Sequence, residues 1–263
     1  MSTTYYLPRE TADACDDERM KHCKNLSLLL DKYPPQAALQ NSAHKNQWLR
    51  TLINKDVIDA DLALHSYRRW HAMTTALGAQ HFQARTDWHL AQGLSNATVL
   101  ETNLTLHPLY GLPRIPGSAL KGLCRNYVTG EISEHRSTTI NTDDETICRI
   151  FGSPDQSGSV IFFDALPLEG KATFALDIIN VHYPDYYMKG KAPVNDQRPN
   201  PLLFLTVANT IFTFALAPHT PRYRERREDV LMTSRWLQEA LQEWGIGGKT
   251  SAGYGYLTSQ IVT

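Results

Sequence analysis

The feature that most constrains the fold is the segment 107–127, HPLYGLPRIPGSALKGLCRNY, in which a proline-punctuated stretch runs into a helical pattern. Pro108, Pro113 and Pro116 fix φ and remove amide donors, so the part before Gly117 is expected to be extended rather than regular. Behind it, apolar residues recur at the spacing of one buried helical face: Leu120, Leu123, Cys124 and Tyr127.

The polar residues of this predicted helix favour an anion. Ser118 suits the N-cap, because its hydroxyl can accept from amides one turn into the helix. Lys121 and Arg125 lie four residues apart on another face, with Gly122 between them. A first-turn lysine opposes the helix dipole, but it is favourable if free amides and cations bind an anion together. Residues 102–130 contain no Asp or Glu, and we therefore predict phosphate binding here.

Here the sequence resembles a known family. PRIPGSALKGLCR, residues 113–125, is similar to the P-x-I-P-G-S-S-L-K-G-x-x-R signature of the RAMP superfamily, the guide-RNA-binding proteins of CRISPR systems. The superfamily's glycine-rich C-terminal loop has its counterpart in residues 245–255, GIGGKTSAGYG. Ala119 stands where the signature often has a second serine, which removes one possible hydroxyl contact.

Three further segments resemble, within that superfamily, the family of sixth RAMP subunits of type III-B (Cmr) effector complexes. They are ETNLTLHPLYGLPRIPGS, FGSPDQSGSVIFFDALP and DIINVHYPDYY, and the resemblance spans residues 82–263. It implies an α+β fold: a ferredoxin-like RAMP domain with inserted strands over residues 79–263, preceded by a helical extension over residues 1–78.

The resemblance also implies a function. We expect a non-catalytic, cytoplasmic RNA-binding backbone subunit that holds the 3′ part of the guide RNA and its duplex with target RNA. The implied partners are guide RNA, target RNA, the adjacent backbone RAMP subunit, the terminal RAMP subunit and the helical small subunit. The residues expected to contact RNA are His107, Arg114, Ser118, Lys121, Arg125, Lys189, Lys191, Arg198, Gly247, Gly248, Lys249 and Thr250.

The overall composition neither indicates nor excludes RNA binding. With 26 Lys and Arg against 27 Asp and Glu, an RNA site must arise from local segregation of charge. No apolar run approaches the roughly 18 residues of a membrane span, and the N-terminus does not resemble a signal peptide. The four cysteines show no C-x-x-C spacing, so we expect reduced thiols and neither metal nor cofactor.

In the first third of the chain the apolar residues recur at helical spacing. Helices are predicted over 16–33, 36–53 and 56–77, with Gly78 as the C-cap of the last. The expected inner face of that last helix is Val57, Leu62, Leu64, Tyr67, Trp70 and Leu77. Two interpretations stay open, a helical appendage packed on the sheet domain or a docking surface for a neighbouring subunit.

From residue 81 the apolar period changes to two. Strands are predicted over 82–90, 159–166, 171–179 and 254–262, with a hairpin formed by 202–207 and 211–217. A second helix is predicted over 229–244, with Val230, Leu237, Leu241 and Trp244 inward. The order of strand, helix, strands, helix and strand is ferredoxin-like, with extra strands between the helices.

The glycine-rich loop 245–255 is predicted to bring the amides of Gly247, Gly248 and Gly253 close to phosphates, with Lys249 as its one charge. A nucleotide-binding P-loop is excluded, because its first glycine is replaced by Glu243 and the flanking elements are reversed. A plain helix stop would explain only the first glycine.

Two basic segments are further candidates. Residues 183–201 carry Lys189, Lys191 and Arg198 among aromatic side chains, a pattern that can stack bases and neutralise phosphates, although a solvated loop is the alternative. Residues 222–227 contain four arginines directly before Glu228 and Asp229, so part of that charge is expected to be structural.

Catalysis is the rival hypothesis. Some RAMP proteins cleave RNA with a histidine, or with an aspartate in the loop after the first strand, but residues 91–100 contain no Asp. The enzyme alternative is a metal-independent endoribonuclease that uses His107 with Tyr110 or Lys121. We favour His107 as a hydrogen-bonding anchor. Asp164, Asp177 and His182 show no metal-ligand spacing, and an assembly scaffold with weak RNA contact is a third possibility.

Overall fold

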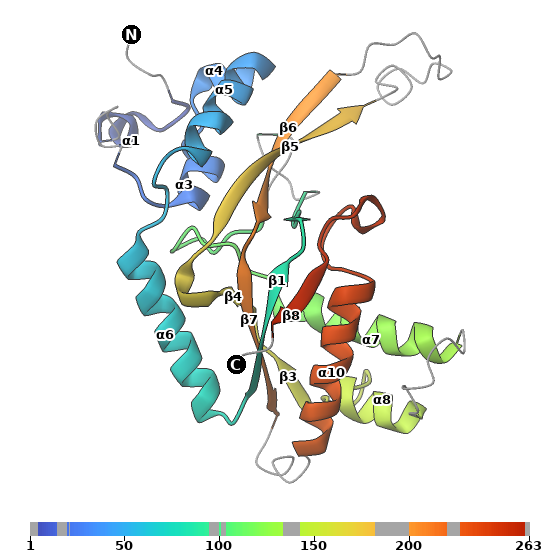
Figure 1. The fold of residues 1–263 in the computed structure, drawn as a ribbon. Coiled ribbons are helices and arrows are strands. Elements are labelled where there is room, and N and C mark those ends of the chain that lie inside the picture. The colour runs from blue at the N-terminus through green and yellow to red at the C-terminus, as the bar shows by residue number, and fades with distance from the viewer. Residues whose placement is uncertain are drawn as a thin grey trace, which may run out of the picture.

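The computed structural model describes residues 5–14, 20, 22–94, 100, 104–133, 143–181, 200–219 and 227–260 (Figure 1). Its N-terminal third is helical, as predicted. The helices are α1 (Arg9–Ala14), α3 (Leu26–Asp31), α4 (Gln36–Gln40), α5 (Ser42–Ile53) and α6 (Ala60–Ala76).

Two asparagines set helix starts that the apolar pattern did not reveal. Within the described residues, the helix predicted over 16–33 is interrupted: Met20 is helical, residues 22–25 are not, and α3 begins at Leu26, because Asn25 accepts a hydrogen bond from the Leu28 amide at 3.1 Å. The helix predicted over 36–53 is two helices, because Asn41 caps α5 by accepting from the Ala43 amide at 2.7 Å. Asparagine is favoured at such positions since its side chain satisfies amides that lack an intrahelical partner.

The buried face of α6 differs from the predicted one. Leu62 and Leu77 are 47% and 41% exposed. Val57 and Tyr67 are buried as predicted, and the other buried residues of α6 are Ala63, Ser66 and Thr74. The small side chain of Ala63 lets α6 approach the chain at Gly170, in the connection between β4 and β5, closely. A Cβ on Gly170 would lie 2.7 Å from the Ala63 backbone. The predicted helix end is confirmed, since Gly78 has a φ of 75° just past the C-cap.

One sheet has the ferredoxin-like order. It contains β1 (Gln80–Thr86), β3 (Val160–Phe162), β7 (Ile211–Pro218) and β8 (Leu257–Gln260), antiparallel in the order β3-β7-β1-β8, with β4 (Leu166–Pro167) also on β7. Helix α7 (Gly117–Ser133) follows β1, and α10 (Arg227–Glu243) precedes β8. Together these elements form a βαββαβ unit, and the predicted fold class is confirmed. Helix α8 (Asp144–Phe151) lies between α7 and β3.

The inserted strands form a second sheet in the order β2-β6-β5. Its strands are β2 (His89–Leu90), β5 (Thr173–Val181) and β6 (Asn200–Ala208). The predicted hairpin is therefore wrong, because β6 and β7 pair in different sheets and Asn209, with a φ of 44°, turns the chain between them. The predicted strands 82–90 and 159–166 are likewise each split, the first into β1 and β2 and the second into β3 and β4.

The core is continuous across both parts of the chain. Leu26 and Leu49 from the N-terminal helices belong to the same apolar cluster as Phe212 of β7 and Leu237 of α10. In Figure 1 the strands lie between α6 on one side and α7, α8 and α10 on the other. The prediction of α10 and its inward residues is confirmed, with Val230, Leu237 and Leu241 buried and Trp244 half-buried. The domain boundary at residue 78 stays a prediction.

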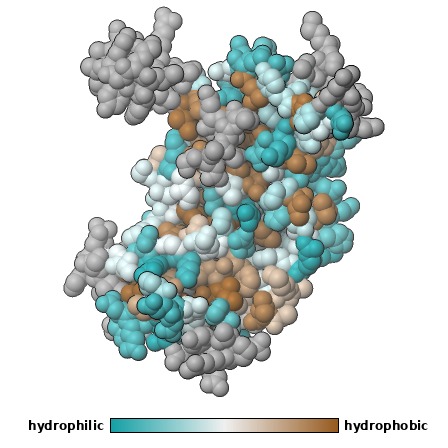
Figure 2. Space-filling model, turned by 180° about the vertical axis from the view of Figure 1, so that it is seen from behind, coloured by the Kyte–Doolittle hydropathy of each residue, from teal (hydrophilic) through white to brown (hydrophobic). Residues whose placement is uncertain are grey.

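The back of the molecule carries apolar residues over its lower half, between more polar regions (Figure 2). Among the described residues, the large apolar side chains that are exposed include Met73, Leu77 and Leu231. No helix in the described part of the chain is long and apolar enough to cross a membrane.

Candidate nucleic-acid interface

The segment before α7 is a tight loop held by the N-terminal helices. The His107 amide donates to the Leu112 carbonyl at 2.7 Å, and the Gly111 amide donates to the His107 carbonyl at 2.8 Å. From the other side, the Asn25 side-chain amide donates to the carbonyl of Pro108 at 3.0 Å. The proline-rich loop before α7 is thus held against Asn25 in the helical part of the chain.

The N-cap prediction for Ser118 is wrong. Helix α7 begins at Gly117, whose amide donates to Asp164 Oδ1 at 2.8 Å, and Ser118 is exposed. The other carboxylate oxygen of Asp164 accepts from Arg114 Nη1 at 2.6 Å. The local sequence is free of acids, but the fold brings a carboxylate from the β3–β4 connection to the helix start. One amide and one arginine of the predicted site therefore already have a partner.

Lys121 and Arg125 keep the positions that the pattern predicted. Leu120, Cys124 and Tyr127 are buried on the opposite face of α7, where burial also raises the pKa of the Cys124 thiol. Arg125 is exposed and Lys121 is half-buried, and neither forms an ion pair with any described residue. An unpaired cation at a helix start is free to meet an anionic ligand.

Lys121 lines two adjoining hollows. The first, of about 380 Å³, is bounded by Ser118 and Lys121 of α7, by β3 and by His219. The second, of about 310 Å³, is bounded by Lys121 and the chain around Gly152 and Gly158. Both glycines are required by packing, because a Cβ at Gly152 would lie 2.7 Å from the Gln156 carbonyl oxygen and one at Gly158 would collide with the Ile150 carbonyl.

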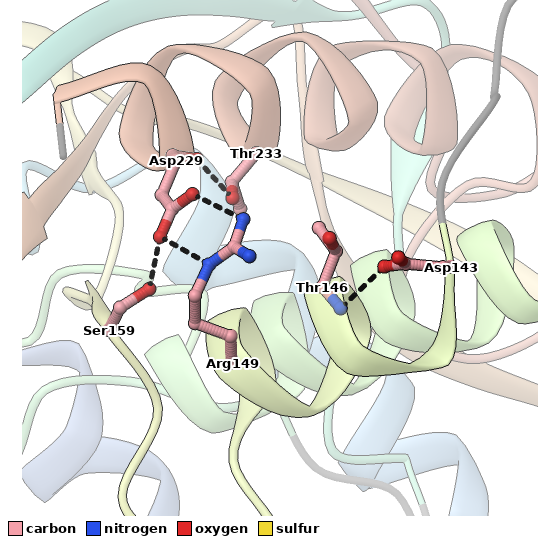
Figure 3. Close-up of polar contacts among 6 residues, drawn as sticks. All are labelled: Asp143, Thr146, Arg149, Ser159, Asp229 and Thr233. Atoms are coloured by element: carbon pink, nitrogen blue, oxygen red, sulfur yellow. Dashed lines mark hydrogen bonds and ion pairs between the residues drawn. The ribbon is translucent and has the colours of Figure 1, made fainter.

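A polar cluster fastens this glycine-flanked loop to α10 (Figure 3). Arg149 donates to both carboxylate oxygens of Asp229, at 3.2 and 2.9 Å, and Ser159 donates to Asp229 at 2.9 Å. The hydrogen bonds from Arg149 to Asp229 raise the pKa of Arg149 above its ordinary value. Since Arg149 precedes the loop and Ser159 follows it, the cluster holds both ends of residues 152–158.

Backbone hydrogen bonds hold the glycine-rich loop in place. The Ile246 amide donates to the Gly255 carbonyl at 2.8 Å, and the Gly248 amide donates to the Ala91 carbonyl at 2.7 Å. The predicted amide contact with phosphate is therefore contradicted at Gly248, whose amide is already used. Gly247 has a φ of 94°, and a Cβ there would lie 2.6 Å from the Ala91 carbonyl oxygen. Internal packing thus explains part of the glycine content.

Lys249 and Thr250 lie half-buried at the turn of this loop. Lys249 has a φ of 63°, a left-handed backbone conformation that residues other than glycine rarely adopt. Its ammonium lies 5.7 Å from the ring centroid of Phe204 and 5.6 Å from that of Tyr254. The lysine therefore lies over Phe204 of the second sheet and Tyr254 of the glycine-rich loop.

Sequence reasoning missed a polar network beside Lys249. Asp177 Oδ2 accepts from the Tyr254 hydroxyl at 2.6 Å and lies 3.1 Å from His89 Nδ1. Burial and the hydrogen bond to Asp177 raise the pKa of Tyr254 to about 12. For Asp177, burial raises the pKa, but the hydrogen bonds from Tyr254 and the Ile178 amide outweigh it and the net pKa is lowered. No local signal links these residues, since they come from three separate segments.

His107 is anchored within its loop. Its Nδ1 accepts from the Leu109 amide at 3.2 Å, and its ring stacks on Tyr110 at 4.5 Å. The Tyr110 hydroxyl in turn accepts from Arg69 at 2.5 Å. Burial, and then the neighbouring Arg114, lower the pKa of His107. The geometry favours the anchoring interpretation over a proton-transfer role.

Several predicted residues lie outside the described part of the chain. They are Lys189, Lys191 and Arg198 of the segment 183–201, and Arg222, Arg224 and Arg226 of the second basic run. Among the residues that the structure does describe, no group of three or more His, Cys, Asp or Glu side chains is arranged to hold a metal ion.

Comparison with known proteins gives a consistent picture. The model of the RAMP superfamily matches residues 81–258. The CRISPR system Cmr subunit Cmr6 of Pyrococcus furiosus is 30% identical over 252 residues, which cover 74% of this chain and 72% of that protein. The CRISPR system CMR subunit Cmr6 of Saccharolobus solfataricus is 28% identical over 158 residues, which cover 59% of this chain and 48% of that protein.

The fold has a counterpart among solved structures. A chain of the type III-B Cmr-beta complex bound to cognate target RNA, known from cryo-electron microscopy, superposes with a TM-score of 0.62 at 22% identity, covering 83% of this chain and 73% of that one. At this identity the likeness concerns the fold.

Proposed function

The chain belongs to the RAMP superfamily, and on that premise we propose that it is a non-catalytic RNA-binding backbone subunit of a type III-B Cmr effector complex. In this role it holds the 3′ part of a guide RNA and its duplex with target RNA. Its protein partners are the adjacent backbone RAMP subunit, the terminal RAMP subunit and the helical small subunit, in the cytoplasm.

The observation that carries the proposal is the position of Lys121. It projects from the first turns of the signature helix between two adjoining hollows of about 380 and 310 Å³, beside a loop whose ends the Arg149–Asp229 cluster holds. Arg125 lies exposed one turn further along α7. A concave polar surface with unpaired cations suits a phosphate backbone, which is bound through charge and shape rather than through base sequence.

The same geometry supports a binding role rather than cleavage. His107, the base of the endoribonuclease alternative, accepts a hydrogen bond from the Leu109 amide and stacks on Tyr110, and its pKa is lowered mainly by burial. Its Nδ1 is therefore occupied in a structural contact. We expect labelled guide and target RNA to stay intact with the purified chain, with and without divalent metal. RNA cleavage that His107→Ala abolishes would establish the enzyme alternative.

The test of RNA binding is Lys121→Ala combined with Arg125→Ala. Affinity for single-stranded RNA should fall for every sequence tested, because the lost contacts are to phosphates. In fluorescence anisotropy titrations at several salt concentrations, each lost phosphate contact should lower the log–log salt slope by about 0.7.

The matched control removes two other exposed lysines, Lys24 and Lys171, which pair with Asp56 and Glu169 away from α7. Lys24→Ala with Lys171→Ala changes the net charge by the same amount but should leave the salt slope unchanged. Equal slopes for wild type and the folded Lys121/Arg125 variant would refute the proposed interface.

A further inference from the structure

Trp88 is an aromatic side chain that the fold leaves in solvent. Of the five tryptophans in the sequence, all within the described residues, only Trp88 is among the exposed large apolar side chains, at 49% exposure. It lies between β1 and β2, at the point where the chain leaves the first sheet for the second. An exposed indole offers a large flat face on which another ring can stack.

The rings beneath Trp88 hold it in place. Its indole stacks on the His89 ring with centroids 4.7 Å apart and an interplanar angle of 24°, and it lies 4.9 Å from the Tyr254 ring. Asp177 in turn fixes both neighbours, through the Tyr254 hydroxyl at 2.6 Å and His89 Nδ1 at 3.1 Å. The platform is thus organised before a ligand arrives, so binding orders few side chains.

A cation and an open loop lie next to this platform. Lys249 places its ammonium 5.6 Å from the centroid of the same Tyr254 ring. Gly253 of the glycine-rich loop also lies near Trp88 and brings no side chain to it: a Cβ at Gly253 would lie 4.0 Å from Trp88 Cε3. A flat ring with a neighbouring cation and little side-chain obstruction matches one nucleotide, in which a base stacks while its phosphate is neutralised.

We infer that Trp88, with Lys249 beside it, forms a stacking site for one unpaired RNA base. The inference deepens the proposed function and rests on it. The base must be unpaired, because a base within a duplex already stacks on its neighbours and presents only its edges. Recognition by stacking is independent of base identity, which suits a protein that accepts any guide sequence.

The test uses the purified full-length chain, a short single-stranded RNA and the same RNA carrying a single abasic site moved along it. Trp88→Ala should weaken binding of the intact RNA roughly tenfold, the size expected for one lost base–aromatic contact. Trp88→Phe, which keeps a ring, should retain most of the affinity. The log–log salt slope of Trp88→Ala should equal that of wild type, because no cation is removed.

The abasic series provides a second readout. At one position the abasic site should weaken binding to wild type but have no effect on Trp88→Ala, since the contact is already missing. Leu231→Ala, which removes another exposed apolar side chain, on α10, is the control and should bind as wild type does.

The outcomes separate this inference from the function on which it rests. If wild type binds no RNA, the proposed function fails and the stacking site with it. If wild type binds RNA but Trp88→Ala binds equally well and no abasic position matters, the stacking site is refuted while RNA binding stands. If Trp88→Ala binds RNA normally but no longer assembles with partner subunits, the occupant is a protein side chain and the inference is wrong.

Discussion

His81 is the residue whose titration the fold alters in the simplest way. Its Nε2 lies 2.8 Å from the Thr74 hydroxyl of α6, and its ring stacks on His71 with centroids 4.6 Å apart. Burial and the neighbouring His71 lower the pKa of His81 below its ordinary value of 6.5. The folded protein therefore binds a proton at His81 less readily than the unfolded chain does.

This difference makes stability depend on pH. A lowered folded-state pKa means that the unfolded chain takes up more protons as the pH falls below about 6.5, so the free energy of unfolding should fall with it. We expect His81→Gln, which can keep the hydrogen bond to Thr74, to flatten this dependence between about pH 5 and pH 7. Urea unfolding across that range measures this dependence, with Leu62→Ala on α6, the helix that carries Thr74, as the control. An unchanged pH dependence in His81→Gln would contradict the assignment.

At the scale of elements, the Arg149–Asp229 pair joins α8 to α10. The side chain of Asp229 is only 6% exposed, whereas that of Arg149 is 30% exposed. The two partners are therefore not equivalent. Removal of Arg149 leaves a buried carboxylate without its cationic partner, while removal of Asp229 leaves an arginine that water can still reach.

The pair yields an asymmetric prediction. Arg149→Ala should lower the free energy of unfolding by about 3 kcal/mol, and Asp229→Ala should lower it by less. The double variant should lose less than the sum, with a coupling of about 1 kcal/mol or more. Chemical denaturation of the three variants tests this, and alanine replacements of the exposed Lys171–Glu169 pair should change stability little. Equal losses for the two single variants would contradict the argument.

At the scale of the whole molecule, the N-terminal helices complete the core. Helix α5 packs on β5 and β6, and Tyr67 of α6 contacts the Thr213 hydroxyl of β7 at 3.1 Å. Buried leucines of α3 and α5 belong to the same apolar cluster as the sheet. These contacts favour the packing interpretation of the helical third, and docking of a neighbouring subunit stays a proposal for its outer surface.

Deletion of residues 1–78 distinguishes the two interpretations. If packing dominates, the remaining chain exposes apolar sheet surface and should aggregate in size-exclusion chromatography. Tyr67→Phe is a milder variant, which removes one buried hydroxyl contact and should cost about 1 kcal/mol in thermal or chemical unfolding. A truncated chain that stays monomeric and binds RNA, but no longer co-purifies with partner subunits, would instead establish the helices as a docking surface.

The sequence alone determined the elements that depend on local patterns. The buried face of α7, the inward residues of α10 and the order of strands and helices follow from apolar periodicity, which each segment expresses without its partners. The same holds for the glycine that ends α6. Recognition of the superfamily rested on short motifs of this kind, and the comparisons confirm it.

Only the tertiary structure decided which segments meet. Asn209 sends β6 and β7 into different sheets, although their sequences resemble a hairpin, because strand pairing depends on contacts made far along the chain. Asp164 lies 47 residues from the Gly117 amide that it caps, and no local rule predicts that a carboxylate will reach an acid-free helix start. Trp88, Asp177 and Tyr254 come together for the same reason: long-range packing, and not the spacing of residues, sets which side chains share a surface.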